Sequence, residues 1–320
     1  MTDDLFGRIR AACERVAQRA EWVEIDAERL GGFAAALARN PPTGPSSDPA
    51  HRGFADPERA LAYLVTLDAI NFGSGWFPVL RKRPGCSGYF TIASALREQF
   101  EDSGPWSASA LRRLDAGECA RVLGQADNRE AAELMAWFAT ALNDLGQLLE
   151  TRFGGRFEAL IEAARGSAAQ LVRILTAMPL YRDVAWHQGE PVPLYKRAQL
   201  TASDLALAFA GEGPGHFDDL SELTLFADNL VPHVLRREGV LRYAPELARR
   251  IDEGVGLEAG GAEEVEIRAV AVHAVERLVE GVRAHGLERC AHELDHWLWN
   301  RGQEPELKAH PRHRARSVYY

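Results

Sequence analysis

Apolar residues recur every three or four positions along much of the chain, as at Leu5, Ile9, Cys13 and Val16. This spacing places them on one face of an α-helix, whereas the period-two alternation typical of half-buried strands is scarce. The same helical periodicity marks further stretches at about residues 57–69, 130–152, 157–177, 203–210, 264–285 and 288–300. We therefore expect an all-α, mainly helical fold with room for one short hairpin.

Pro and Gly interrupt the helical pattern at several places, most clearly over residues 40–49. These residues break both helix and strand hydrogen bonding, so we interpret such stretches as loops. The other interruptions are at residues 73–88, 186–193, 211–215 and 253–262. They are short and evenly spread, and no internal repeat is visible, so we expect one compact domain over residues 1–320.

Composition and charge exclude some classes of protein and some kinds of partner. The 320 residues are 46% hydrophobic and 26% charged, which is ordinary for a globular enzyme and excludes a disordered or fibrous chain. The net charge is -9, whereas binding to nucleic acid or to an anionic membrane depends on an excess of Lys and Arg. We expect no direct nucleic-acid polymer partner and no membrane partner, and a local basic patch stays an open alternative.

The four cysteines, Cys13, Cys86, Cys119 and Cys290, are scattered and form no Cys-x-x-Cys pair. This pattern argues against a disulfide scaffold and against a zinc ribbon. The N-terminus is acidic, and no run of about 18 apolar residues exists. We expect reduced thiols and a cytoplasmic protein.

A literal H-E-x-x-H pattern occurs at His292, Glu293 and His296, the arrangement in which two histidines hold zinc and the glutamate acts as base. The extended zinc-protease motif needs Gly and then His further on, but Trp299 and Gly302 occupy those positions. We interpret the segment as an amphipathic helix and keep a zinc-dependent hydrolase as an alternative.

Asp228 ends an apolar run, residues 223–227, that reads as buried. A carboxylate in such a place is costly unless it is paired, hydrogen-bonded or used, so Asp228 is a candidate functional group. A helix cap is the simpler interpretation. Lys196, in a Lys-Arg-Ala-Gln stretch, is a second candidate, against the simpler interpretation of a surface lysine.

Asn71, Phe72, Trp76 and Phe77 place one amide and three aromatic rings around a glycine-containing turn. Such a group suits stacking on a heterocyclic base with recognition of its edge, although a hydrophobic plug under a loop has the same composition. Glu266 and Arg268 on a predicted helix form a structural ion pair in the simpler interpretation.

The C-terminal stretch is rich in His and Arg, including Arg312, His313 and Arg316. It is either a solvated basic tail or the clamp for a single phosphate group.

Six short motifs together resemble the queuosine salvage protein family. They occur in the same order from about residue 54 to the C-terminus, and six in register are far more specific than any one. The motifs are DAINF (68–72), KRAQ (196–199), LTLFAD (223–228), EVEIRA (264–269), LDHWLW (294–299) and HRARSVYY (313–320).

The resemblance implies an N-glycosidase that hydrolyses a small-molecule substrate, queuosine 5′-monophosphate, and releases queuine for reuse in tRNA modification. Use of the free nucleoside queuosine is left open. It also implies a helical fold similar to DNA glycosylases, and no metal or other cofactor. The family's catalytic aspartate corresponds to Asp228 and its pocket lysine to Lys196. The chain departs from the family pattern at Asn229, at His233 and in the turn at residues 73–75.

With this resemblance in hand, the remaining site residues are assigned to parts of the nucleotide. Asn71, Glu266 and Asp295 are expected to meet amino groups of the base. Phe72, Trp76 and Trp299 are expected to stack on it, and His313 and Arg316 to hold the phosphate. Phe77 and Arg268 complete the expected substrate-binding set. A non-catalytic nucleobase-binding protein is the other alternative.

Overall fold

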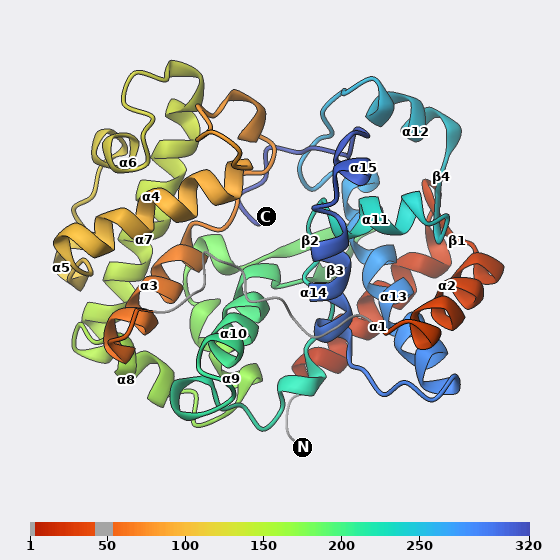
Figure 1. The fold of residues 1–320 in the computed structure, drawn as a ribbon, viewed down its shortest axis with the longest axis horizontal. Helices are drawn as coiled ribbons and strands as arrows, with labels where there is room; N and C mark the ends of the chain where they lie inside the picture. The colour runs from red at the N-terminus through yellow and green to blue at the C-terminus, as the bar shows by residue number, and fades with distance from the viewer. Residues whose placement is uncertain (1–3, 42–53) are drawn as a thin grey trace. The chain divides into compact units, whose positions relative to one another are not determined.

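The computed structural model describes residues 4–41 and 54–320, and these residues are mainly helical (Figure 1). The expectation of an all-α fold is confirmed, since the strands are short and form two sheets of two strands each in the described part of the chain. No helix in these ranges has the length and apolar character needed to cross a membrane.

The chain forms two compact units, each assembled from separate segments. The described residues of unit 1 are 4–41, 183–196 and 221–316, and those of unit 2 are 54–182, 197–220 and 317–320. One compact domain was expected over residues 1–320; that expectation stays a prediction.

Unit 1 is built around one long helix. Its elements are α1 (Leu5–Arg19), β1 (Val23–Ile25), α2 (Ala27–Arg39), β2 (Val184–His187), β3 (Glu190–Pro193), α11 (Val231–Arg237), β4 (Leu241–Tyr243), α12 (Pro245–Asp252), α13 (Ala262–Ala284), α14 (Ala291–Arg301) and α15 (Pro305–Lys308). Helix α13 packs against α1, α2, α11 and α14 (Figure 1). It is buried nearly all round, including the charged side chains of Glu264, Glu266 and Arg268. Buried charges must be paired, so a polar network is expected around these side chains of α13.

Unit 2 contains the second long helix, α7 (Ala132–Phe153). Its other α-helices are α3 (Pro57–Ala69), α4 (Gly88–Ser103), α5 (Ala108–Leu111), α6 (Ala116–Val122), α8 (Phe157–Glu162) and α9 (Ala168–Leu175), followed by α10 (Lys196–Ala208), which begins at the last residue of a unit 1 segment. Helix α7 packs against α3, α5, α6 and α8. Gly146 permits the close approach of α5, because a Cβ there would lie 2.5 Å from the Ala108 carbonyl oxygen.

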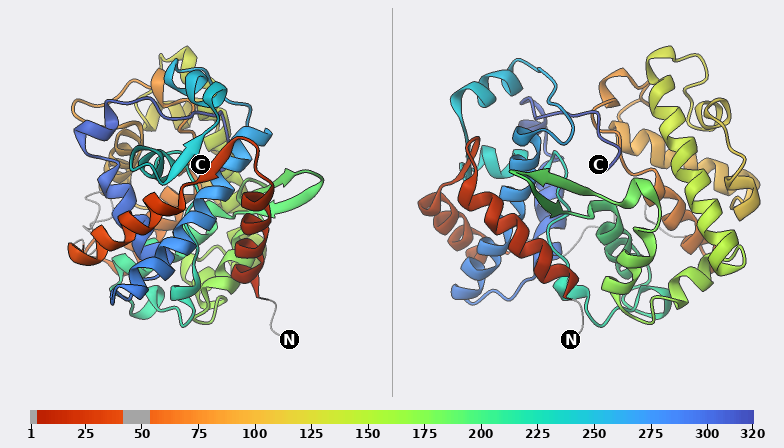
Figure 2. Two further views of the ribbon diagram at one scale, coloured as in Figure 1. Left: turned by 90° about the vertical axis from the view of Figure 1, so that its right-hand side faces the viewer. Right: turned by 180° about the vertical axis from the view of Figure 1, so that it is seen from behind.

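The expected break at residues 186–193 is wrong, because this stretch forms most of the β2–β3 hairpin. Gln188 and Gly189 make its two-residue turn with φ of 49° and 81°, the backbone that matches the twist of paired strands. Figure 2 shows the hairpin projecting from unit 1 in its left view. The prolines at 191 and 193 obscured the strand pattern in the sequence.

Other predictions differ in their boundaries. The helix expected over 157–177 is two helices, α8 and α9, separated where Arg165 and Gly166 adopt φ of 52° and 72°. The sheet of β1 and β4 was not predicted. The loop expected at 40–49 lies mostly outside the described residues. The four cysteines are free, as expected.

Candidate active site

Asp228 ends the segment 223–228, which is neither helix nor strand but is held in place by hydrogen bonds. Residues 223–227 are buried, as the sequence predicts, and Asp228 itself is half-buried. Its Oδ1 accepts hydrogen bonds from the backbone N–H groups of Leu230 at 2.7 Å and Val231 at 3.1 Å, where α11 begins. Oδ1 therefore fixes the carboxylate, whereas Oδ2 has no hydrogen-bond partner among the described residues of unit 1.

Three buried side chains hold the backbone on either side of Asp228. The Asp295 carboxylate on α14 accepts from the Phe226 N–H at 3.0 Å. The Arg268 Nε donates to the Ala227 carbonyl at 2.9 Å, and the Asn229 amide donates to the His313 carbonyl at 3.2 Å. Two of these side chains, Asp295 and Arg268, lie far from the segment in the sequence, and Asn229 bonds it to the distant backbone of His313.

Lys196 is 6% exposed, which rules out the interpretation of a surface lysine. Its backbone N–H donates to Asp183 Oδ2 at 3.1 Å. The same carboxylate receives both terminal nitrogens of Arg268, at 3.1 and 2.7 Å. Arg268 thus forms its hydrogen-bonded ion pair with Asp183 rather than with Glu266, and the buried Glu264 lies 3.6 Å from the same guanidinium.

Glu266 also has an internal role. Its Oε1 lies 3.1 Å from His187 Nε2, and its Oε2 accepts from the Trp22 N–H at 2.6 Å. At 1% exposure, both Glu266 and Arg268 belong to the framework that packs α13 against neighbouring segments of unit 1. Trp299, on α14, is half-buried.

The turn at 71–77 lies in unit 2, and its aromatic residues are held firmly there. Trp76 is 1% exposed and its Nε1 donates to Glu133 at 2.7 Å. Phe72 makes an edge-to-face contact with Phe138, with ring centroids 5.1 Å apart. Asn71 and Phe77 are half-buried, so among the four candidate residues of the turn they are the two with exposed surface.

Arg197, next to Lys196, was not among the predicted site residues. Its guanidinium lies 4.6 Å from the Phe72 ring centroid and 4.4 Å from that of Tyr181. It donates to the carbonyls of Ala69, Leu180 and Val318. Arg197 therefore ties the aromatic turn of unit 2 to the C-terminal residues of the chain.

The C-terminal basic residues differ strongly in charge. His313 is buried, and desolvation, followed by the nearby Arg268, lowers the pKa of its ring to about 3. It is therefore neutral at physiological pH, whereas Arg316 is exposed. Burial lowers the pKa of the half-buried Arg312, while the charge of Asp228 opposes that shift. Arg312 lies within electrostatic reach of Asp228, a placement that no pattern in the sequence indicated.

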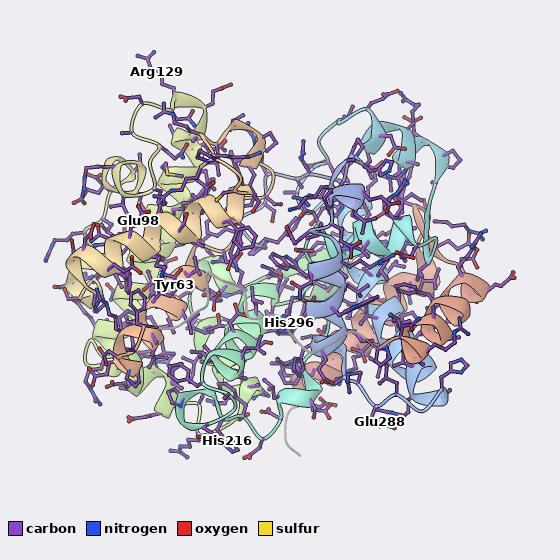
Figure 3. The ribbon with its side chains drawn as sticks, viewed as in Figure 1. Tyr63, Glu98, Arg129, His216, Glu288 and His296 are labelled. Carbon is purple, nitrogen blue, oxygen red and sulfur yellow. The ribbon has the colours of Figure 1, made fainter. Side chains whose placement is uncertain are left out.

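The H-E-x-x-H motif begins helix α14, on which Figure 3 labels His296. Glu293 accepts from the Cys290 N–H at 2.9 Å and so caps the helix. The His292 and His296 ring centroids are 6.2 Å apart. Within residues 4–41 and 54–320, no cluster of three or more His, Cys, Asp or Glu is placed to hold a metal ion.

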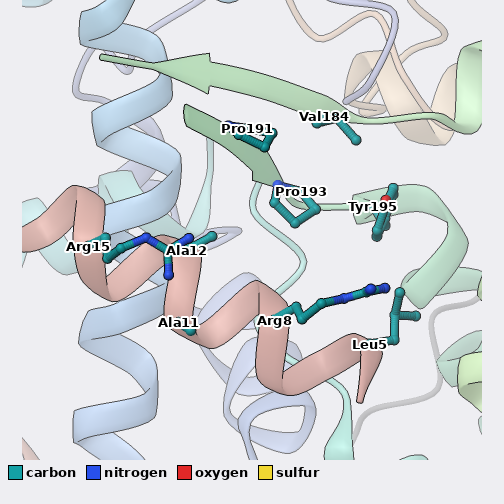
Figure 4. A pocket seen from close by; sticks show the side chains of 9 residues that line it. All are labelled: Leu5, Arg8, Ala11, Ala12, Arg15, Val184, Pro191, Pro193 and Tyr195. Atoms are coloured by element: carbon teal, nitrogen blue, oxygen red, sulfur yellow. The ribbon is translucent and has the colours of Figure 1, made fainter. Parts of the chain in front are cut away.

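A groove of about 370 Å³ lies in unit 1 between α1 and the β2–β3 hairpin (Figure 4). It ends at Tyr195, toward which the Arg8 side chain extends. The lining residues are Leu5, Arg8, Ala11, Ala12, Arg15, Val184, Pro191, Pro193 and Tyr195. None of the predicted site residues lines this groove, although Tyr195 directly precedes Lys196.

Comparison with known proteins gives a consistent result. The profile described as "Queuosine salvage protein" matches residues 51–320. A protein of Sphaerobacter thermophilus, named queuosine 5′-phosphate N-glycosylase/hydrolase, is 38% identical over 96% of this chain and 95% of its own length. Proteins of the same name from Bos taurus and Mus musculus are 32% and 29% identical, over 98% and 82% of this chain and 93% and 82% of their own lengths. The chain therefore belongs to the queuosine salvage protein family.

Proposed function

We propose that this protein is an N-glycosidase that hydrolyses the C1′–N bond of queuosine 5′-monophosphate. Water is consumed, and the products are queuine and ribose 5-phosphate. The observation that carries the proposal is the match of almost the whole chain to relatives named for this reaction. The released base is available for tRNA modification, and the proposed place of action is the cytoplasm.

Asp228 is the proposed catalytic residue. Breaking the C1′–N bond develops oxocarbenium character on the ribose, and a fixed carboxylate stabilises that charge or directs the attacking nucleophile. Two backbone N–H groups hold Oδ1, so Oδ2 keeps one direction without reorganising during the reaction. This division of the two oxygens supports the assignment.

The leaving group makes positioning important. A 7-deazapurine lacks the N7 atom that a glycosidase protonates on an ordinary purine. Holding the nucleotide in a reactive orientation must then lower much of the barrier. The rigid attachment of the Asp228 segment to α13 and α14 is consistent with this requirement.

Lys196 is the second proposed catalytic residue, and its buried position favours a specific electrostatic partner. Its ammonium group either pairs with Asp228 or meets the ribose and phosphate of the nucleotide. For the 5′-phosphate we propose arginine contacts, with Arg316 retained and Arg312 added. His313, being neutral, would contribute a hydrogen bond rather than a charge.

The proposed base contacts are those expected from the sequence, except that the most buried residues are reassigned to packing. Asn71 offers its amide, and Phe77 and Trp299 offer rings. Phe72, Trp76 and Glu266 act mainly through packing, because they are 1–2% exposed and contact neighbours within their own units.

The test is release of queuine from queuosine 5′-monophosphate, followed by chromatography. Asp228→Ala is expected to lower the rate by about a hundredfold or more, the usual cost of losing a charge-stabilising group. Asp228→Asn keeps an Oδ1 acceptor for Leu230 and Val231, so an equal loss would assign the effect to charge rather than to local folding.

Asp219→Asn is the matched control, because Asp219 accepts N–H groups at the start of α9 in unit 2 and has no proposed catalytic role. Binding of the nucleotide without release by the parent protein would favour the non-catalytic binding protein. Equal activity of the parent and Asp228→Asn would remove Asp228 from the mechanism. Loss of activity in a chelator would revive the zinc alternative.

A further inference from the structure

Asp183 is a buried carboxylate that the site residues named above do not include. It is 2% exposed and begins the segment of unit 1 that ends at Lys196. Its backbone carbonyl accepts the N–H groups of Leu194 at 2.9 Å and Tyr195 at 3.2 Å. Its carboxylate accepts the Lys196 N–H. Asp183 therefore closes the base of the β2–β3 hairpin and fixes the residue that follows it.

Arg268 extends this connection to the other catalytic segment. Its two terminal nitrogens meet the two oxygens of Asp183, and its Nε donates to the carbonyl of Ala227, the residue before Asp228. One planar guanidinium thus joins the backbone at Lys196 to the backbone at Asp228. All of these contacts lie within unit 1.

The backbone conformation beside Lys196 supports a functional reason for this arrangement. Tyr195 has a φ of 48°, a region that residues other than Gly adopt at a cost and that occurs often at functional sites. Two hydrogen bonds to Asp183, from the N–H groups of Tyr195 and Lys196, flank this conformation. The buried pair therefore maintains a strained backbone beside a proposed catalytic group.

Stability alone does not account for the pair. Burying two charges is expensive, and apolar residues of similar volume often replace a buried ion pair with no loss of stability. A bidentate arginine, in contrast, imposes a defined distance and orientation that apolar packing does not.

We infer that Asp183 is a positioning residue, which acts through Arg268 and the Lys196 N–H to set the placement of Lys196 relative to Asp228. The inference rests on the proposed function. It goes beyond it in assigning part of the rate to a residue that need not touch the nucleotide.

The test compares kcat and KM for queuosine 5′-monophosphate in the parent, in Asp183→Asn and in a triple variant, Asp183→Leu with Arg268→Met and Glu264→Gln. Each is assayed about 10 °C or more below its own melting midpoint, beside the parent at the same temperature. Asp183→Asn is expected to lower kcat by about 10- to 100-fold with KM within about threefold, because misplaced catalytic groups lose rate more than binding.

The triple variant separates positioning from stability. It removes both charges of the pair and that of Glu264, whose Oε1 lies 3.6 Å from Arg268, so no buried charge of this group is left unpaired. Its melting midpoint is therefore expected to recover toward that of the parent while its kcat stays low. Recovery of both, or a kcat within about threefold of the parent for Asp183→Asn, would overturn the inference.

Glu276→Gln is the control, since it removes another partly buried carboxylate from α13, one that pairs with Arg10 at 3.2 Å. Its kcat is expected to match that of the parent, and an equal loss there would also count against the inference. A parent that releases no queuine contradicts the proposed function instead, so the two failures are distinguishable.

Discussion

Asp228 and Asp183, both in unit 1, differ in the burial and in the hydrogen-bond partners of their carboxylates. Asp228 is half-buried, and Oδ2 has no partner among the described residues of its unit. Both oxygens of Asp183 are bonded, and the side chain is almost fully enclosed. An oxygen left available suits chemistry, whereas a saturated carboxylate suits the alignment of other groups.

At the same scale, His233 predicts a pH dependence of stability. It is buried, desolvation lowers its pKa from 6.5 to about 4, and its Nε2 donates to the Leu307 carbonyl at 3.0 Å. As pH falls below 6.5, His233 becomes protonated in the unfolded chain but stays neutral in the folded protein until the pH approaches 4. The stabilisation is therefore complete above that pH and is lost as pH falls toward 4.

The measurement is the free energy of unfolding by denaturant at pH of about 7.5 and 5. His233 should account for a loss of about 2 kcal/mol between them. His233→Gln keeps an amide that can donate to Leu307 but does not titrate, so its loss should be smaller by that amount. Identical losses in the two proteins would show that His233 does not drive the dependence.

Among elements, the close packing of α7 against α5 depends on the absence of a side chain at Gly146. A Cβ at Gly146 would lie 2.5 Å from the Ala108 carbonyl oxygen and 2.7 Å from the Arg112 backbone nitrogen, and neither backbone atom can rotate away. Gly146→Ala is therefore expected to destabilise the protein by about 1–3 kcal/mol despite the better helix propensity of Ala.

Gly31→Ala, in α2, is the matched comparison because nothing lies within 4 Å of the added Cβ. It is expected to stabilise the protein by about 0.5–1 kcal/mol through helix propensity alone. Both values come from denaturant unfolding. A neutral or stabilising Gly146→Ala would mean that α5 moves away from α7 at little cost.

Elements were predictable from the sequence where periodicity was long and regular. The stretch expected over 57–69 is α3, and the one expected over 264–285 is α13 within two residues. The β1–β4 pair was missed because strands of three residues carry too little pattern, and they meet across more than two hundred residues. Asp183 was missed for a related reason, since it meets Arg268 across 85 positions and no local motif marks it.

The molecule as a whole was the least predictable scale. Each of its two units is assembled from separate segments, and the chain leaves a segment of unit 1 between Lys196 and Arg197, at the start of helix α10 rather than at a linker. Composition changes mark linkers, so they do not reveal such a crossing. Net charge, in contrast, is a property of the whole chain that the sequence states directly.

That charge leads to the last prediction, which concerns nucleic acid. The chain carries a net charge of -9, and several of its arginines are paired with carboxylates at the surface. Examples are Arg83 with Glu98 and Arg249 with Glu246 and Glu253. Such pairs and the net negative charge weaken the counterion release on which polynucleotide binding depends, so a phosphate monoester is the favoured ligand.

We expect no saturable binding of labelled tRNA in fluorescence anisotropy at about 150 mM salt, under conditions in which queuosine 5′-monophosphate raises the melting midpoint. Exchanging Glu98 for Gln, which frees Arg83, is expected to change neither result. Saturable tRNA binding that weakens steeply with salt would contradict the prediction. It would indicate a basic surface that the overall charge conceals, and it would extend the substrate from the free nucleotide to the modified RNA itself.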